Sequence, residues 1–387
     1  MTQQIDDFRE EVRQFIDASL PDELRGAGNR SDLPGGPLGK WVKALADKGW
    51  ITPEWPTEYG GGGLDRKHAA ALRAEFKAVR APIIGSFGTA MLGPTLLEYG
   101  TEEQKKEFLP PISRHEIRWC QGFSEPGSGS DLASLQCRAV KEGDEYVITG
   151  QKIWTTGAQI ADWIFCLVRT DTEAPKHEGI TFILFPMDQP GVEVAPLMLI
   201  DGSAHFAQVF FNEARAKAKD VIGPLNGGWT VAKRLLQHER GTEGDSDGGV
   251  GGAARESVVD LIKREVGFEN GALADAHIRE RLAAHEIDKR ALSLTMRRAQ
   301  EAGRAGQLER DISSIGKFRW ADMIKNEQDI AMDAMGTQGL GWEGDGFDAN
   351  QLQRTRKWLT TRSDSIWGGT NEIQKNVIAK RVLRIPE

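Results

Sequence analysis

The chain has 387 residues, of which 39% are hydrophobic and 27% charged, and its formal net charge is -8 at pH 7. This length and composition are typical of a globular enzyme with two or three lobes. The acidic balance, without a long basic stripe, argues against nucleic acid as the main ligand, and no apolar run approaches the roughly 18 residues that a membrane span needs.

The N-terminal segment, MTQQIDDFREEVRQFID, predicts an amphipathic helix. It places Ile5, Phe8, Val12 and the Phe15/Ile16 pair on one face at helical spacing. A folded acidic helix is unlike a signal or transit peptide, so we expect a cytoplasmic protein. The cysteines agree with a reducing compartment, because they show no zinc-ligand or disulfide spacing and no metal site is expected; they are Cys120, Cys137 and Cys166.

The hydrophobic period changes twice along the chain. Residues 1–118 predict helices, and residues 226–387 predict helices again, with long helical periodicity. Between them, residues 119–225 contain short β-branched or aromatic runs bounded by turn residues. These runs are Tyr146–Ile148, Trp163–Val168, Ile180–Phe185 and Val209–Phe211. The sequence therefore predicts a mostly α-helical protein with a middle β-domain.

Two polar, glycine-containing segments of the β-region indicate a seat for a flat ligand. They are QGFSEPGSGSD at Gln121–Asp131 and KIWTTGA at Lys152–Ala158, the second of which follows a predicted hairpin. Glycines allow positive φ and close approach of a ligand, hydroxyls donate hydrogen bonds, and an indole offers a flat face. The residues concerned are Gly122, Gly127, Gly129, Ser124, Thr155, Thr156 and Trp154. A solvated Ser/Gly loop beside a core tryptophan is the alternative.

Three motifs resemble the signatures of the acyl-CoA dehydrogenase family, in matching order and spacing: SEPGSGSD, KIWTTGA and WGGTNEIQ. Further segments at Glu54–Leu64 and Gly93–Ile112 extend the likeness over nearly the whole chain. The resemblance implies an N-terminal helical domain, a β-barrel-like middle domain and a C-terminal four-helix bundle. It also implies FAD as cofactor, an acyl-CoA substrate, an electron-transfer flavoprotein as acceptor, and a homodimer, homotetramer or heterotetramer.

The resemblance assigns roles to individual positions. The flavin ring would be lined by Gln121, Phe123 and Ser124, and its dimethylbenzene and N5 side would be flanked by Trp154 and Thr156. The substrate would be contacted by Ser130 at its pantetheine or thioester end and by Arg240 at its CoA part. The adenosine half of FAD would be held by Thr370 and Glu372. Helix capping or core packing is the alternative for each position.

The catalytic base departs from the commonest family pattern. Many members carry it as the Glu of a YEGT motif, where this chain has Gly368. A subset of the family instead places Glu followed by Arg on a bundle helix, and LLQHERG supplies Glu239 and Arg240 there. On a helix, Glu239 shares a face with Leu235, and burial raises the pKa of a carboxyl group and makes it a better base. A surface or ion-paired glutamate is the alternative.

The predicted function is FAD-dependent α,β-dehydrogenation of an acyl-CoA to the trans-2-enoyl-CoA. Two departures keep alternatives open. The family's Arg-x-x-Phe-Gly element has no clear match, and the glycine-rich stretch Glu243–Ala254 follows the candidate base directly. One alternative is an acyl-CoA flavoprotein that does not dehydrogenate, such as a sulfinoacyl-CoA desulfinase. The other is a structural partner subunit of a heteromeric dehydrogenase.

Overall fold

The computed structural model describes residues 2–26, 36–242, 256–305 and 312–386, without the side chains of residues 2, 239–242, 300 and 304. The chain packs as two units. Unit 1 comprises Met1–Leu197 and Ala204–Ala254, and unit 2 comprises Met198–Ser203 and Arg255–Glu387. The division into domains at 118/119 and 225/226 stays a prediction.

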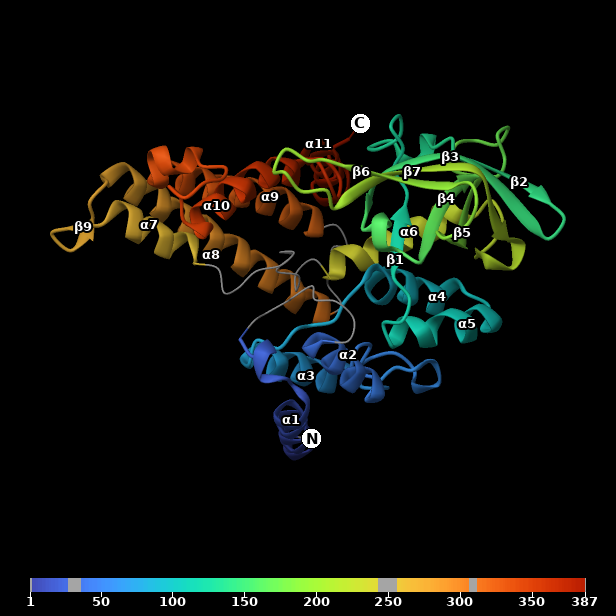
Figure 1. The fold of residues 1–387 in the computed structure, drawn as a ribbon, viewed down its shortest axis with the longest axis horizontal. Coiled ribbons are helices and arrows are strands. Elements are labelled where there is room, and N and C mark those ends of the chain that lie inside the picture. Colours follow the sequence, from blue (N-terminus) through green and yellow to red (C-terminus); the bar gives the residue numbers. More distant parts are fainter. Residues whose placement is uncertain (1, 27–35, 243–255, 306–311, 387) are drawn as a thin grey trace. The chain divides into compact units, whose positions relative to one another are not determined.

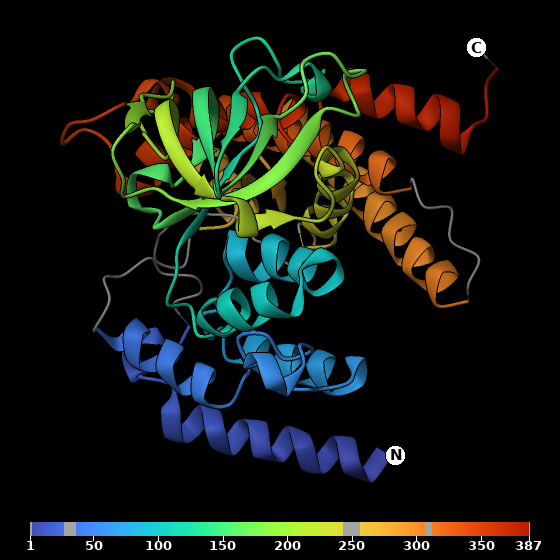
Figure 2. The same ribbon diagram turned by 90° about the vertical axis from the view of Figure 1, so that its right-hand side faces the viewer.

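Unit 1 begins with five helices (Figure 1): α1 (Thr2–Ser19), α2 (Pro37–Asp47), α3 (Arg66–Ala78), α4 (Gly93–Tyr99) and α5 (Glu102–Ser113). The amphipathic N-terminal helix is confirmed, because Val12 and Ile16 are buried in one cluster with Trp41 and Leu72. Helix α5 begins at a capping box in which Thr101 and Gln104 satisfy each other's backbone N–H groups. In Figure 2, α4 and α5 (cyan) lie between the other three helices and the sheet.

An eight-stranded sheet forms the rest of unit 1. Its strands are β1 (Trp119–Gly122), β2 (Arg138–Glu142), β3 (Glu145–Thr156), β4 (Trp163–Arg169), β5 (Ile180–Pro186), β6 (Val192–Leu197), β7 (Phe206–Lys217) and β8 (Val221–Ile222). The order is β6-β7-β3-β2-β4-β5-β8, with β1 parallel to β4. All four predicted runs lie in strands, and the predicted hairpin is β2–β3. The predicted mostly helical fold with a middle β-domain is confirmed.

The central strands β4 and β5 are buried on both faces. Along β4, Phe165 and Leu167 join the cluster shared with α4 and α5, whereas Ile164 and Cys166 join a second cluster. A strand buried on both sides is expected to be continuously apolar, as WIFCLV is. Helix α6 (Gly228–Thr242) packs on β5, and its Leu235 lies in the first cluster.

Unit 2 consists mainly of helices: α7 (Val258–Val266), α8 (Ala276–Arg304), α9 (Ile312–Met335), α10 (Ala349–Thr360) and α11 (Asn371–Val377), with a small hairpin of β9 (Phe268–Glu269) and β10 (Ala272–Leu273). The segment 198–203 packs with this unit through Asp201. Its carboxylate accepts a bond of 2.6 Å from Thr360 Oγ1, and Arg356 donates to its carbonyl at 3.0 Å.

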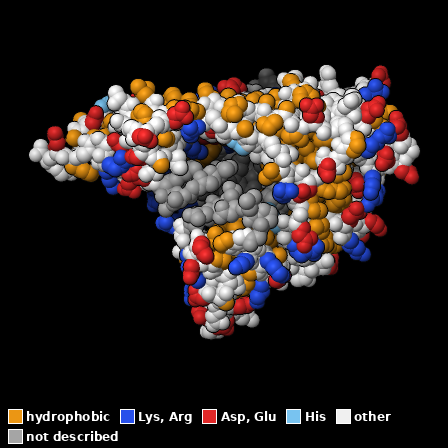
Figure 3. All heavy atoms as spheres, in the orientation of Figure 1, with side chains coloured by type: hydrophobic (Ala, Val, Ile, Leu, Met, Phe, Trp, Pro, Cys, Tyr) orange, Lys and Arg blue, Asp and Glu red, His pale blue; other side chains and the backbone are white. Residues whose placement is uncertain are grey.

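The distribution of charged side chains on the surface is relevant to the expectation that nucleic acid is not the main ligand. On the face drawn in Figure 3, basic and acidic side chains of the described residues are interspersed and no broad field of one sign is seen. No helix within the described ranges is long and apolar enough to cross a membrane.

Candidate functional site

The two signature segments lie side by side in unit 1. The N–H of Ile153, on β3, donates to the carbonyl of Ser124 at 2.9 Å. Lys152 adds two further bonds, to the Phe123 carbonyl at 3.0 Å and to Glu125 Oε1 at 2.7 Å. The loop after β1 is therefore fastened to β3 where KIWTTGA begins.

A β-bulge in the second signature segment, KIWTTGA, exposes the side chain of Trp154. Lys152 pairs with Val209 and Thr155 with Ala207, so β3 has one extra residue between these pairs. Trp154 lies in this bulge with a φ of 61° and is 55% exposed. Its ring packs edge-on against Phe206, with 6.0 Å between the ring centroids. A strained, exposed indole is costly to a sheet unless a ligand covers it.

The two threonines after the bulge differ in burial. Thr156 is half-buried, whereas Thr155 is fully buried and its Oγ1 meets no partner among the described residues. Of the two residues, only Thr156 keeps exposed surface next to Trp154 in the strand. The assignment of Thr155 to the cofactor stays a prediction that its burial does not support.

The glycines of this segment matter for the room that their missing Cβ leaves, not for an unusual backbone conformation. None of Gly122, Gly127 and Gly129 has positive φ, so of the two properties that glycine offers here, only close approach to the backbone applies. A Cβ on Gly122 would lie 2.7 Å from Ile164 Cδ1, so a larger residue here would force the Ile164 side chain of β4 to shift. Around Gly127 and Gly129 a Cβ would meet no described atom within 4 Å, which leaves room for a ligand beside the backbone.

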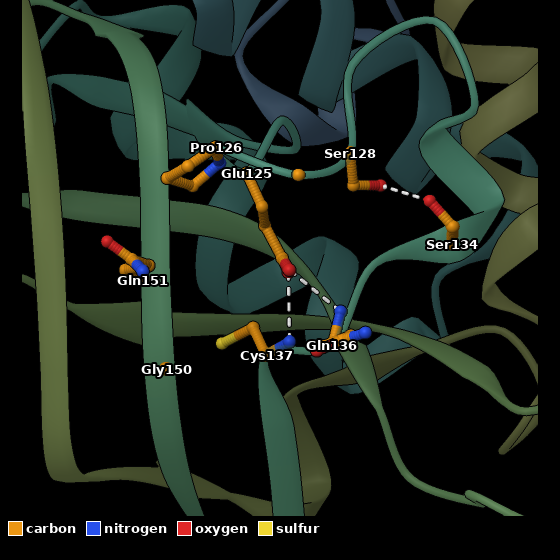
Figure 4. A pocket seen from close by; sticks show the side chains of 9 residues that line it. Glu125, Pro126, Ser128, Ser134, Gln136, Cys137, Gly150 and Gln151 are labelled. Atoms are coloured by element: carbon orange, nitrogen blue, oxygen red, sulfur yellow. Dashed lines mark hydrogen bonds between the residues drawn. The ribbon is translucent and has the colours of Figure 1, made fainter.

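Glu125 organises the interior of the loop (Figure 4). Its carboxylate accepts from the N–H groups of Gln136 at 2.7 Å and Cys137 at 2.9 Å, toward which the side chain points. Lys152 supplies the third bond. Burial disfavours the Lys152 ammonium, but the neighbouring Cys166 and Cys137 sulfurs and, after them, the Glu125 carboxylate hold the pKa of Lys152 above its usual range. Beside Glu125 lies a pocket of about 320 Å³, lined by Pro126, Gly127, Ser128, Ser134, Gln136, Cys137, Gly150 and Gln151.

The other loop residues divide into core and surface. Phe123 is 5% exposed and packs edge-on against Phe165 and Phe182, so it belongs to the core, and its role toward the flavin stays a prediction. Gln121 and Ser124 are half-buried, and Ser130 is exposed. Gln121 thus lies at the end of β1, and Ser124 and Ser130 lie in the loop that follows it, which is bonded to β3 through Ser124; their roles toward ligands stay predictions.

The third signature lies in unit 2. Thr370 is the N-cap of α11 and accepts from the Ile373 N–H at 3.3 Å, as its capping alternative states. Glu372 is in the first turn, where backbone N–H groups and the Thr370 hydroxyl lower the pKa of its carboxyl group. Gly368 and Gly369 have φ of 63° and 90°. Their roles toward adenosine stay predictions.

Helix α6 carries the candidate base. Its backbone is helical through Thr242, which includes Glu239 and Arg240, but the side chains of these two residues lie outside the described part, as does the glycine-rich stretch after them. The helix is held by Arg234, whose Nε lies 2.9 and 2.7 Å from the two carboxylate oxygens of Glu98 on α4. His238 Nε2 lies 3.5 Å from the same carboxylate.

Sequence reasoning missed Glu125 and Lys152 as site residues. Both stand inside the quoted motifs, but their contact joins positions 27 residues apart. The signal lies in the structure: Lys152 has no exposed surface, and a buried ammonium requires a partner.

The residues of unit 1 fit a flavin. An exposed indole, an accessible threonine hydroxyl and open space beside two glycines lie next to the half-buried Ser124. Such a surface suits a large aromatic ring system with polar edges.

Comparisons with known proteins identify the family of this chain. The sequence matches the models of the acyl-CoA dehydrogenase N-terminal domain over residues 2–116, the middle domain over 120–213 and the C-terminal domain over 226–383. Acyl-CoA dehydrogenase IpdE1 of Mycobacterium tuberculosis is 38% identical over 390 residues, covering 99% of this chain and 98% of that protein.

Two solved structures are similar throughout. The Tcur3481–Tcur3483 steroid acyl-CoA dehydrogenase is 32% identical with a TM-score of 0.77, covering 100% of this chain and 98% of that chain. The ChsE4–ChsE5 complex from Mycobacterium tuberculosis is 25% identical with a TM-score of 0.74, covering 100% and 99%. Proteins of this kind are FAD-dependent oxidoreductases. From its three domain models and its full-length relative, this chain belongs to the acyl-CoA dehydrogenase family.

Proposed function

We propose that this chain dehydrogenates an acyl-CoA thioester to the trans-2-enoyl-CoA, with Glu239 as the base that removes the α-proton. The observation that carries the proposal is the bulge of β3, which presents Trp154 and Thr156 beside the Ser124 loop. When bound, FAD supplies the acceptor for the β-hydrogen, which leaves as hydride.

The backbone at Gly368 supports a base elsewhere. Its φ of 63° is favourable for glycine and costs other residues about 1–2 kcal/mol, so the C-terminal loop is not shaped for a glutamate at this position. Glu239 lies one turn after Leu235, which is fully buried in the core of unit 1. A carboxylate near apolar side chains becomes a stronger base once substrate excludes water.

The remaining residues are proposed to hold the two ligands. Ser124, Thr156, Trp154 and Gln121 would bind the flavin ring, and Ser130 and Arg240 the acyl-CoA. Ser130 is exposed on a loop with open space at Gly129, as a contact to a long flexible ligand requires. Thr370 and Glu372 would bind the adenosine half of FAD, with an electron-transfer flavoprotein as the subsequent acceptor.

We further propose a polycyclic acyl group, as in a steroid-derived thioester, and a heteromeric assembly. Both rest on the structure described as a steroid acyl-CoA dehydrogenase, which is 32% identical over the full chain and contains two named proteins. The ChsE4–ChsE5 structure is likewise a complex of two proteins.

Anaerobic mixing of the FAD-loaded protein with CoA thioesters tests this function. The panel contains a steroid-derived, a branched and a straight-chain thioester, with the free steroid acid as the control for the CoA requirement. We expect the steroid-derived thioester to bleach the flavin absorbance fastest and the free acid to leave it unchanged. Bleaching by no thioester would contradict dehydrogenation, and release of sulfite from a sulfinoacyl-CoA would favour the desulfinase instead.

A further inference from the structure

Lys152 is a charged side chain enclosed in the sheet of unit 1. It has no exposed surface, and its Nζ donates to only two groups among the described residues, the Phe123 carbonyl at 3.0 Å and Glu125 Oε1 at 2.7 Å. Glu125 is 9% exposed and is satisfied by backbone N–H groups at the far end of the loop as well. The carboxylate therefore keeps the ammonium charged, while the ammonium remains free to act on the Phe123 carbonyl.

The Phe123 carbonyl belongs to the same peptide group as the Ser124 N–H. A cation bonded to the carbonyl oxygen of a peptide draws electron density from its nitrogen and makes its N–H a stronger donor, an effect that low local dielectric enhances. The Ser124 N–H meets no acceptor among the described residues, although the Ser124 carbonyl is bonded to Ile153. Ser124 is half-buried next to the bulge that presents Trp154.

We propose that Lys152 is a positioning residue that polarises the peptide between Phe123 and Ser124, so that the Ser124 N–H donates more strongly to bound flavin and favours its reduced form. The direction follows from charge: a reduced flavin ring is richer in electrons than an oxidised one and gains more from a strong donor. The proposal rests on the proposed function only for the presence of flavin at this loop, and requires neither Glu239 nor any thioester.

A second ion pair on the same loop provides a matched control. Lys176 Nζ lies 2.9 Å from both carboxylate oxygens of Asp131, with side chains 51% and 59% exposed. This pair also fastens the loop, but it joins two side chains and involves no peptide group of the loop. Lys176→Met therefore loosens the loop without removing a polarised peptide.

The experiment measures the midpoint potential of bound flavin by chemical reduction without thioester. The test variant is Lys152→Met with Glu125→Gln, because removing both charges together avoids an unpaired buried charge. We expect the affinity for reduced relative to oxidised FAD to fall at least tenfold, which for a two-electron couple is about 30 mV. Lys176→Met should keep the wild-type potential. A double variant that binds FAD with the wild-type potential would overturn the proposal.

A measurement on the wild-type protein keeps the proposal testable if the double variant does not fold. Hydrogen exchange of overlapping fragments that isolate the Ser124 amide is compared between the FAD-free and FAD-loaded protein. We expect FAD to slow exchange at Ser124, and unchanged exchange there would also overturn the proposal. Since neither measurement uses an acyl-CoA, failure here is distinct from failure of the proposed dehydrogenation.

Discussion

Gly368 has left-handed backbone, with φ of 63°, at the position where many family members carry the base. Gly368→Glu is expected to lower the free energy of unfolding by about 1–2 kcal/mol, because an L side chain is strained there. It should not restore flavin reduction in a Glu239→Gln background. Chemical denaturation measures the first effect and anaerobic mixing with thioester the second.

Gly346 is the control for this substitution. It lies in the same unit, is exposed, has no positive φ and has open space at its Cβ. Gly346→Glu is therefore expected to change stability by less than about 0.5 kcal/mol. Equal stability of the two variants would show that the backbone at Gly368 does not exclude a side chain.

Asp220 is a buried carboxyl group whose ionisation opposes folding. It is 2% exposed, its Oδ1 meets no hydrogen-bond partner in the described part of the chain, and Lys219 Nζ is 3.9 Å away. Burial raises the pKa of Asp220 from 3.8 to about 6. The folded state thus binds the proton more tightly than the unfolded state, so the cost of the charge is absent below pH 3.8, grows as the pH rises, and is complete above about pH 6.

Asp220→Asn removes that cost. The variant is expected to be more stable than the wild type by about 1–3 kcal/mol near pH 7.5, with the gain fading as the pH approaches about 4. Denaturant unfolding across this range measures it, with the exposed Asp188→Asn as control. A variant that is no more stable than wild type at neutral pH would refute the assigned burial cost.

At the scale of elements, α6 is the helix on which the proposed chemistry depends. The Glu98–Arg234 pair joins α4 to α6 one turn before Glu239. Since both partners are about 40% exposed, Glu98→Gln should lower the free energy of unfolding by only about 0.5–1 kcal/mol. Flavin reduction by thioester should nevertheless slow several-fold, because a small displacement of a base costs rate steeply.

Glu107→Gln is the matched control for the α6 pair. Glu107 pairs with Lys219 at similar exposure, and neither residue lies on α6. Its loss should change stability to the same small degree and leave the rate of flavin reduction unchanged. Equal rates of flavin reduction in the Glu98→Gln and Glu107→Gln variants would show that the Glu98–Arg234 ion pair does not help to position Glu239.

Elements with a strong period were predictable from sequence, whereas their irregularities were not. The runs WIFCLV and ITFILF became β4 and β5 because both faces of these strands are buried. The bulge at Trp154 depends on how β3 pairs with β7 more than 50 residues later, a relation that no local pattern contains. The same holds for the burial of Thr155 and for the contact between Lys152 and Glu125.

At the scale of the whole molecule, packing divides the chain differently from its periodicity. The segment 198–203 lies between β6 and β7 of unit 1 in sequence, yet Asp201 is bonded to Thr360 and Arg356 of α10. A short connection between two strands gives no local signal of such a tertiary attachment. The motifs predicted family and cofactor because they are contiguous in sequence, but the attachments between distant segments required coordinates.

The central claim, that Glu239 is the base, is tested most directly by single-turnover flavin reduction. Glu239→Gln and its neighbour Glu243→Gln are each loaded with FAD and mixed anaerobically with saturating thioester. We predict that Glu239→Gln still binds FAD and thioester but reduces flavin about 10²–10⁴-fold more slowly, whereas Glu243→Gln keeps the wild-type rate. A Glu239→Gln protein that reduces its flavin at the wild-type rate would contradict the account.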